Sequence, residues 1–219
     1  MVNSKGRVVK LIGMLDSPYV RRVAISLQLL GLRFEHQSLS VFRGFDEFRL
    51  INPVVKAPTL VCDDGTVLLD STLILAYAEA LARPRSLVPT GVLALQRELR
   101  LTGLALAACE KAVQIVYERG LRPAEKLHQP WVDRVTGQLL AAFGALEAEW
   151  QRQPLQATTV GLTQAGVSTA VAWEFTQQTL PGLVPEVAHP ALVAFSAAAE
   201  ALPAFRAAPH GDGTCTPAA

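Results

Sequence analysis

The chain is poor in the residues that build metal sites and disulfide frameworks. Its 219 residues include only three cysteines, Cys62, Cys109 and Cys215, and their spacing fits neither a zinc motif nor a set of paired cysteines. Four histidines are scattered without the spacing of metal ligands: His36, His128, His189 and His210. The sequence therefore predicts no metal site and no disulfide framework, and the reducing cytoplasm is the expected location.

The chain also lacks an excess of either charge and a long apolar run. Its 20 Lys and Arg balance 19 Asp and Glu, which gives no electrostatic footprint for nucleic acid or a membrane surface. Arg21 and Arg22 form the one adjacent basic pair inside a predicted helix, and we expect them on a solvated face. No span approaches the ~20 apolar residues that cross a bilayer, and Lys10 makes the first apolar run a poor signal peptide. We therefore expect no nucleic-acid partner and no membrane partner.

What the chain does contain is a strand-to-helix junction at Ser17-Pro18-Tyr19. An apolar strand is predicted over residues 8–13 and an amphipathic helix over residues 18–31. Pro18 suits a first helical turn, where its missing N–H has no partner, and Ser17 is the predicted N-cap. Because helix N-termini favour anions, a thiolate brought to Ser17 would be stabilised there. An ordinary serine cap is the alternative interpretation.

A second group of elements occupies the next fifty residues or so. Strands are predicted over 34–39, 59–62 and 66–69, with an irregular helical segment over 43–51 and a helix over 71–82. Pro58 precedes a strand although a proline cannot donate to a sheet, and a cis Ala57–Pro58 bond would resolve this conflict. Asp70 and Ser71 cap the last of these helices. The order βαβ followed by ββα predicts an α/β domain over residues 1–82.

The second half of the chain is helical. Residues 83–90 form a proline-bounded linker. Beyond it, apolar residues at helical spacing predict an all-α domain over residues 91–208; they are Leu95, Leu99, Leu106, Cys109, Val113 and Val116, then Trp131, Val135, Leu139, Phe143, Leu146 and Trp150. Residues 160–180 carry a single charge and predict the buried central helix of this domain. The tail, 209–219, is expected to be flexible.

Three motifs together resemble the cytosolic glutathione transferases, and the resemblance covers nearly the whole chain. In order they are Ser17-Pro18-Tyr19, then Asn52-Pro53-Val54-Val55-Lys56-Ala57-Pro58, then Asp70-Ser71. The resemblance implies a thioredoxin-like N-terminal domain, an all-α C-terminal domain, glutathione as co-substrate and a homodimer. Serine at the first motif position resembles the serine-type classes, as in a bacterial member of the family.

The resemblance also implies a role for each matching residue. Ser17 resembles the hydroxyl that donates to the glutathione sulfur and lowers the thiol pKa from its ordinary value of about 8.5. Ala57 would pair through its backbone with the cysteinyl part of the peptide, and Lys56 resembles a glutathione contact. Asp70 and Ser71 resemble the pair that holds the γ-glutamyl end, with the carboxylate of Asp70 on the ammonium group. Plain helix capping is the other interpretation of this pair, and both roles are compatible.

Three neighbours of the junction affect this interpretation. Ser17 and Val20 occupy the positions where a disulfide-exchanging protein needs cysteine, so that chemistry is disfavoured. Tyr19 is a rival hydroxyl, which we rank well behind Ser17 because it follows Pro18. Asp16 would oppose a nearby thiolate by like-charge repulsion, and we expect it to point away.

The sequence departs from the family pattern at the start of the predicted buried helix. That helix usually begins with a capping box of the form [ST]-x-x-D, and here Thr163 is followed at the acid position by Gly166. The return hydrogen bond is lost, and glycine lowers helix propensity by up to about 1 kcal/mol. On this basis the sequence predicts that Gly166→Asp would raise thermal stability.

The electrophile site is the least defined part of the prediction. Met14, Leu15, Tyr117 and Trp173 are candidates by position, with core packing as the alternative for Met14, Leu15 and Trp173. Two functions stay open. One is an enzyme that joins glutathione to a small hydrophobic electrophile, as in detoxification. The other is a non-catalytic glutathione- or ligand-binding protein, or an interaction scaffold with the same fold.

Overall fold

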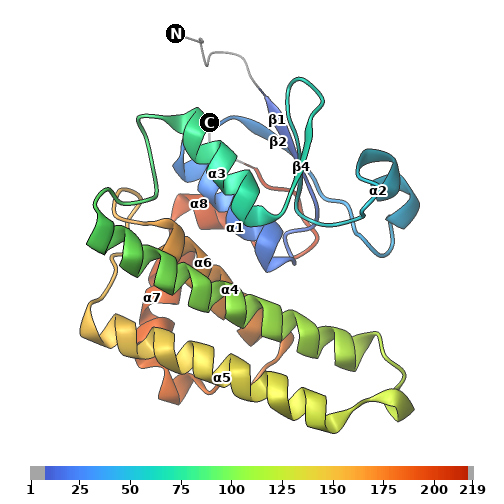
Figure 1. Ribbon diagram of the computed structural model, residues 1–219, viewed down its shortest axis with the longest axis vertical. Helices are drawn as coiled ribbons and strands as arrows, with labels where there is room; N and C mark the ends of the chain where they lie inside the picture. Colours follow the sequence, from blue (N-terminus) through green and yellow to red (C-terminus); the bar gives the residue numbers. More distant parts are fainter. Residues whose placement is uncertain (1–7, 217–219) are drawn as a thin grey trace. The chain divides into compact units, whose positions relative to one another are not determined.

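The computed structural model describes residues 8–216, which fall into two compact units (Figure 1). The first unit comprises residues 8–87 together with 201–216, and the second comprises residues 88–200. Within residues 8–216, no helix combines the length and the apolar character needed to cross a membrane.

A mixed four-stranded sheet forms the centre of the first unit. Its strands are β1 (Val9–Ile12), β2 (Phe34–Gln37), β3 (Thr59–Val61) and β4 (Val67–Leu69), in the order β2-β1-β3-β4. β1 runs parallel to β2 and antiparallel to β3, and β3 runs antiparallel to β4. The strands lie within the ranges predicted from the sequence. β1 is an inner strand of the sheet, and the chain passes from its C-terminal end directly into the Ser17 junction. The junction therefore lies beyond the end of a strand that has neighbours on both sides.

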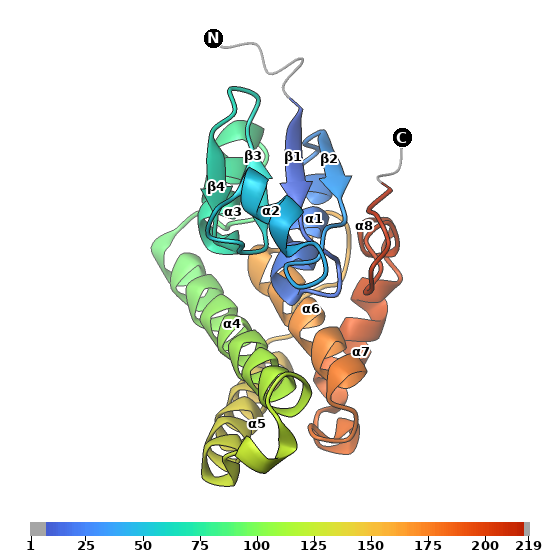
Figure 2. The same ribbon diagram turned by 90° about the vertical axis from the view of Figure 1, so that its right-hand side faces the viewer.

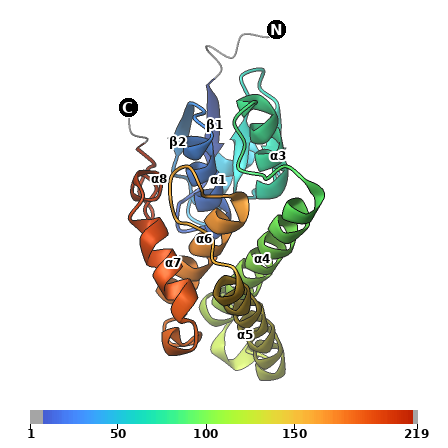
Figure 3. The same ribbon diagram turned by 90° about the vertical axis from the view of Figure 1, so that its left-hand side faces the viewer.

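Helices cover both faces of this sheet. α1 (Pro18–Leu29) and α3 (Ser71–Ala82) pack against each other on one face, and α2 (Phe45–Ile51) lies on the other (Figures 2 and 3). Beneath α2, the buried side chains of Ile12, Leu39 and Phe48 form an apolar cluster. The α/β architecture expected for the first part of the chain is confirmed.

The end of the chain returns to the first unit. α8 (Pro203–Arg206) packs against α1, and Gln28 of α1 donates from Nε2 to the Ala204 carbonyl at 3.0 Å. Further on, the Thr216 N–H donates to the Ala207 carbonyl at 3.0 Å, and Cys215 is buried. Residues 209–216, expected from the sequence to form a flexible tail, thus contact the first unit, while 217–219 lie outside the described residues. The boundary expected at 208 also differs, because the chain leaves the second unit after residue 200.

The second unit is built of helices. They are α4 (Val92–Gly120), α5 (Gln129–Arg152), α6 (Gln164–Thr179) and α7 (Pro190–Glu200), with short 3-10 turns at η1 (Ala124–Lys126) and η2 (Glu186–Ala188). α4 packs against α5 and α6, and α7 packs against α5 and α6. Most of α6 is buried, so the predicted buried central helix is confirmed. Edge-to-face rings fill the space between helices, with Phe143 and Trp173 centroids 5.3 Å apart.

Two buried glutamates cap the helices of this unit from a distance in sequence. Glu98 on α4 accepts the Ala165 N–H at the start of α6 at 2.6 Å. Glu147 on α5 accepts the N–H groups of Ala191 and Leu192 at the start of α7, both at 2.9 Å. A carboxylate is well placed at a helix N-terminus because it meets unpaired N–H groups and the positive end of the helix dipole.

Glu98 changes the interpretation of Gly166. Thr163 caps α6 through the Gly166 N–H at 3.4 Å, but an acid is already present at this end of the helix, supplied by α4. A Cβ on Gly166 would lie 3.1 Å from Leu162 Cδ1 and 3.3 Å from Phe195 Cζ. The sequence-based expectation that Gly166→Asp stabilises the protein is therefore reversed.

The buried stripe of α4 also differs from the predicted one. Leu99 is 62% exposed, and of the six predicted positions on this helix only Cys109 is buried. The buried positions are mostly small residues: Leu101, Ala105, Ala108, Cys109, Ala112 and Ile115, together with Glu98. Small side chains allow neighbouring helices to approach closely, and the three buried alanines lie between Leu101 and Ile115 along this face of α4.

Candidate functional site

Ser17 is the N-cap of α1, as predicted. Its backbone is extended (φ −75°, ψ 123°), and its Oγ accepts the Val20 N–H at 3.4 Å. Within residues 8–216 this is the one hydrogen bond of the Ser17 side chain, and it uses the oxygen as acceptor. The hydroxyl proton is therefore available for an external acceptor at the positive end of a 12-residue helix.

A tight contact joins this junction to the cis-proline loop. The Ala57–Pro58 peptide bond is cis. Gly13, at the end of β1, has φ +136°, and a Cβ there would lie 2.6 Å from Val20 Cγ2 and 3.0 Å from the Ala57 Cβ. Only glycine fits this conformation and this space. The start of α1 and the Ala57 residue therefore both lie directly against Gly13.

Asn52 braces the loop that carries Ala57, a function that the sequence analysis did not assign. It is 2% exposed, and its Oδ1 accepts the Val54 N–H at 3.0 Å. Its Nδ2 donates to Thr59 Oγ1 at 2.8 Å, and the Thr59 hydroxyl donates to the Lys56 carbonyl at 2.8 Å. The Lys56 side chain is exposed and lies on the loop between α2 and β3. The Asn52-Pro53 pair, which is typical of a turn, is the sequence signal from which this hydrogen-bonding role of Asn52 could have been predicted.

Backbone strain marks both segments predicted to hold the peptide. Among residues 8–216, Val55 (φ 51°) and Asp70 (φ 70°) are the two non-glycine residues with positive φ. Val55 precedes Lys56, and Asp70 is the N-cap of α3, where its Oδ1 accepts the Thr72 N–H at 2.9 Å. Strained non-glycine residues cluster at ligand sites, because the surrounding structure has to hold them in place.

Arg22 connects α1 to the start of α3. Its Nη1 donates to Ser71 Oγ at 3.1 Å and to Thr72 Oγ1 at 3.4 Å. A guanidinium can only donate, so the Ser71 oxygen acts as acceptor in this contact and its own proton is left to point elsewhere. A buried cation and a helix N-terminus thus meet at Ser71, an arrangement that favours an anion.

The solvated face expected for Arg21 and Arg22 is wrong, because each side chain is 2% exposed. Arg21 lies over the Phe205 ring, 5.7 Å from its centroid, and its Nε donates to the Ala208 carbonyl at 2.8 Å. These partners come from distant parts of the chain. Periodicity within the helix could not reveal them.

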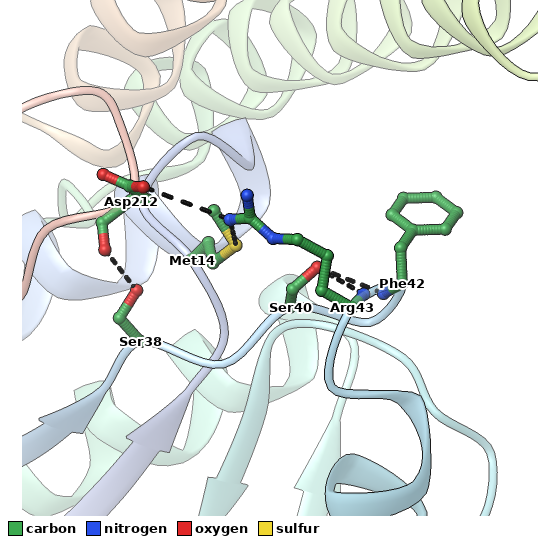
Figure 4. A network of polar contacts seen from close by, with 6 residues as sticks. All are labelled: Met14, Ser38, Ser40, Phe42, Arg43 and Asp212. Atoms are coloured by element: carbon green, nitrogen blue, oxygen red, sulfur yellow. Dashed lines mark hydrogen bonds and ion pairs between the residues drawn. The ribbon is translucent and has the colours of Figure 1, made fainter.

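Asp16 lies in an electrostatic cluster beside Ser17. Its side chain is exposed by area, yet neighbouring atoms withdraw the carboxyl from water, and this desolvation raises the pKa of Asp16. His210, the Ser17 N–H and Arg43 act in the opposite direction, and Asp212 adds to the rise. Figure 4 shows Arg43 reaching toward Met14 Sδ at 3.8 Å and Asp212 Oδ2 at 4.0 Å.

The four candidates for the electrophile site differ in exposure. Leu15 is fully buried in the first unit, and Trp173 is 4% exposed in the second, packed on Phe143 and His189. For these two, the core-packing alternative is favoured. Met14 is partly exposed, and Tyr117 on α4 is 45% exposed. Tyr19, which carries the rival hydroxyl, is a half-buried residue.

The described residues contain no group of three or more His, Cys, Asp or Glu that could hold a metal ion. The three cysteines are buried and not joined in disulfides. Burial raises the pKa of Cys215 to about 11, which keeps its thiol neutral at pH 7. Burial of all three thiols is typical of structural rather than reactive cysteines.

Comparison with known proteins decides the nature of the first unit. Residues 11–86 match the family model described as "Glutathione S-transferase, N-terminal domain". The first unit is therefore similar to the N-terminal domain of glutathione S-transferases. It contains Ser17, the cis-proline loop and the start of α3. The thioredoxin-like fold followed by a helical domain, expected from the sequence, is confirmed.

Relatives and solved structures extend the similarity beyond this domain. The chain is 26% identical over 174 residues, 80% of its length and 86% of the relative's, to the uncharacterised GST-like protein YibF of Escherichia coli K12. It is 30% identical over 86 residues to glutathione S-transferase U7 of Arabidopsis thaliana, covering 39% of this chain and 38% of that protein.

A glutathione transferase family member from Pseudomonas fluorescens Pf-5 has been solved with bound glutathione. It shares 27% identity and a TM-score of 0.78, over 91% of this chain and 98% of that one. The same protein with bound S-(propanoic acid)-glutathione gives 28% identity and a TM-score of 0.75, over 91% and 96% of the two chains.

Proposed function

We propose that the protein is a serine-type glutathione transferase that activates the thiol of glutathione for attack on a small hydrophobic electrophile. The observation that carries the proposal is the set of contacts made by the first turns of α1. Val20 lies against Gly13, which also lies against Ala57, and Arg22 donates to Ser71. One helix start thus joins all three motif segments.

In this proposal Ser17 stabilises the thiolate and does not itself form a covalent bond. The Ser17 hydroxyl donates to the sulfur, and the N-terminus of α1 adds the helix dipole, so the thiol loses its proton more readily. The thiolate then attacks an electrophilic carbon, forming a carbon–sulfur bond while a leaving group departs with its electron pair.

The other end of the peptide would bind at the start of α3. Ser71 and the free N–H groups of this helix would meet the γ-glutamyl carboxylate, with the Arg22 cation behind them. Asp70 would meet the ammonium group, and its positive φ of 70° is the kind of backbone strain that clusters at ligand sites. Ala57 would pair through its backbone with the cysteinyl part, and Lys56 would contact the peptide from the same loop.

The bound molecules of the Pseudomonas fluorescens structures support a peptide site of this kind. One of them, S-(propanoic acid)-glutathione, is glutathione substituted at sulfur. Met14 and Tyr117, whose side chains retain contact with solvent, are the two candidates we keep for contact with the electrophile. We further propose a homodimer, a location in the cytoplasm and a role in detoxification.

A non-catalytic glutathione-binding protein or scaffold is the competing function. The observation in its favour is Asp16, a carboxyl next to Ser17 that opposes thiolate formation when ionised.

Turnover with 1-chloro-2,4-dinitrobenzene, measured alongside calorimetric glutathione binding, separates the two functions. For the transferase, Ser17→Ala should lower kcat by about 10- to 1,000-fold, as loss of one stabilising donor does elsewhere, while binding of glutathione changes little. Ser40→Ala is the matched control, because Ser40 also accepts backbone N–H groups in the same unit but lies outside the motifs. Glutathione binding without turnover in the wild type would instead support the non-catalytic function, and absence of both would contradict the proposal.

A further inference from the structure

The C-terminal segment, residues Pro209–Thr216, is attached to the first unit close to Ser17. Its Cys215 is buried, the Cys215 N–H donates to His36 Nδ1 at 2.8 Å, and Gln28 of α1 donates to the Cys215 sulfur at 3.5 Å. Ser38 donates to the Asp212 carbonyl at 2.7 Å (Figure 4). The segment is therefore fixed at several points, none of which belongs to the three motifs.

His36 joins this segment to the end of β1. Its second ring nitrogen, Nε2, lies 2.8 Å from the Gly13 carbonyl oxygen. A backbone N–H can only donate, so Nδ1 must be unprotonated to accept from Cys215. The Gly13 carbonyl can only accept, so the proton is on Nε2. Both contacts are satisfied together by one form of the ring, the neutral Nε2–H tautomer.

Gly13 is the point from which the ring can act on Ser17. The Gly13 N–H donates to the Gln37 carbonyl at 3.1 Å, and the side chains of Val20 and Ala57 lie so close that a Cβ on this residue would collide with Val20. The chain turns between Gly13 and Ser17, whose N–H donates to the Met14 carbonyl at 3.2 Å. A shift of the Gly13 carbonyl would therefore be transmitted into the turn that presents the Ser17 hydroxyl.

Charged residues of the C-terminal segment also contribute to the electrostatic field at the Gly13–Ser17 turn. His210 lowers and Asp212 raises the pKa of Asp16, the residue next to Ser17. Asp212 lies 4.0 Å from Arg43, whose Nη2 is 3.8 Å from the Met14 sulfur. Both side chains of that ion pair are largely exposed, so it adds little stability by itself. Its position, however, places charges of the C-terminal segment around the Gly13–Ser17 turn.

We infer that His36 is a positioning residue for Ser17, which couples the docked C-terminal segment to the Gly13–Ser17 turn through its two ring nitrogens. The coupling is a property of the folded chain, whereas its effect on turnover rests on the proposed function. Protonation of His36 would place an N–H on Nδ1 opposite the Cys215 N–H, and two donors cannot form a hydrogen bond. Acid should therefore release the segment and disturb the turn together.

The ionisable groups around His36 are few enough for this titration to be assigned. Burial lowers the pKa of His36 from 6.5, and the Gly13 carbonyl partly restores it. The segment contributes the Cys215 thiol, whose pKa of about 11 keeps it neutral, besides His210 and Asp212. On the strands, Lys10 lies opposite Glu35 in the β1–β2 register, one position before Leu11 and His36, and Asp16 lies in the turn after β1. Desolvation raises the pKa of Asp16, so Asp16 and His210 are each distinguished from His36 by a variant of their own.

The test is a pH titration of backbone amide signals by NMR, without glutathione, in the full-length protein. The Cys215 and Ser17 amides should shift together with a single midpoint below 6.5, and His36→Asn should abolish the shared titration. A chain ended after Ala208 keeps His36 but lacks Cys215, and the midpoint of His36 should then move toward 6.5. Asp16→Asn, His210→Asn and His128→Asn should each keep the titration that the Cys215 and Ser17 amides share; the Asp16 variant is needed because the Ser17 N–H lies against that carboxyl.

Conjugation kinetics provide the second readout. In His36→Asn, kcat/KM should fall by about 10- to 100-fold, the scale of a small displacement of a reacting group. The part of its pH dependence that follows the Cys215 amide below 6.5 should disappear, which leaves the dependence due to ionisation of the glutathione thiol. A Cys215 amide that titrates while the Ser17 amide does not would overturn the inference, as would an unchanged pH profile in His36→Asn. If the amides titrate together but no variant turns over the substrate, the coupling stands and the proposed function fails.

Discussion

Gly166 offers a stability prediction in which sequence and structure give opposite answers. By pattern alone, aspartate at this position completes a capping box and should stabilise α6. In the folded protein the new Cβ would lie 3.1 Å from Leu162 Cδ1 and 3.3 Å from Phe195 Cζ, distances at which the neighbours have to move. The new carboxylate would also lie one residue from Ala165, whose N–H already binds the buried Glu98 at 2.6 Å.

The expected magnitude comes from these competing effects. Replacing glycine gains less than about 1 kcal/mol of helix propensity, a restored cap contributes about 1 kcal/mol, and overpacking costs about 1–3 kcal/mol. A second buried carboxylate beside Glu98 adds a further unfavourable contribution, because like charges repel and neither is fully hydrated. The propensity, capping and packing contributions nearly cancel, so the unfavourable burial of the new carboxylate decides the sign. We expect Gly166→Asp to be destabilised by about 1 kcal/mol, which corresponds to a drop in Tm of about 2–4 °C for a protein of this size.

Thermal and urea unfolding of four variants would test this expectation. Gly166→Ala introduces the same Cβ without the charge, so its difference from Gly166→Asp isolates the carboxylate. In a Glu98→Gln background that difference should shrink, because the repelling charge is absent. A Gly166→Asp protein that melts above the wild type would show that neither packing nor charge repulsion dominates at this position.

Three further outcomes are expected from the same structure. Glu147→Ala should lower the free energy of unfolding by about 3 kcal/mol, because two N–H groups at the start of α7 lose a charged acceptor, whereas Glu147→Gln keeps one acceptor oxygen and should lose less in urea unfolding. Asn52→Ala should cost about 2 kcal/mol by leaving buried polar groups without partners, and glutathione binding measured by calorimetry should weaken with it. The pKa of His36 is lowered on folding, so its contribution to stability is fully present above pH 6.5 and is lost as pH falls from 6.5 through the folded value. Unfolding free energies of the wild type and His36→Asn, measured across about pH 5–7, should therefore differ in slope. Equal slopes would contradict this assignment.

Much of the first unit could be predicted from the sequence, because its elements are marked by local signals. Ser17 and Pro18 define the start of α1, and Asp70 defines the start of α3, where the side chain itself makes the capping bond. Each of these features depends on residues within a few positions of one another. Local patterns therefore place the strands, the helices and the cis bond at Pro58 close to where the structure has them.

What could not be predicted depends on partners distant in sequence. Arg22 has the pattern of a surface residue in its helix, but Ser71, 49 positions later, accepts its hydrogen bond. The C-terminal tail has the composition of a flexible end, yet His36, 179 positions away, accepts the Cys215 N–H. Glu98 replaces the acid that Gly166 lacks by binding Ala165 from 67 positions away. In each case tertiary structure satisfies a polar group that the local pattern leaves unassigned.

The electrophile candidates illustrate a different difficulty. Apolar side chains such as Leu15 and Trp173 are equally suited to a core and to the wall of a ligand site, and residue type does not distinguish the two. Burial does so here, since neither side chain has appreciable contact with solvent.

The role proposed for Ser17 is tested most sharply by the pKa of the glutathione thiol when the peptide is bound. This pKa can be followed by the ultraviolet absorbance of the thiolate in the wild type and in Ser17→Ala, with glutathione saturating in both. We predict a midpoint below the ordinary value of about 8.5 in the wild type, and a shift upward by about one unit or more when the hydroxyl is removed. The same midpoint in both proteins would show that Ser17 does not activate the thiol, and the proposed mechanism would then be wrong.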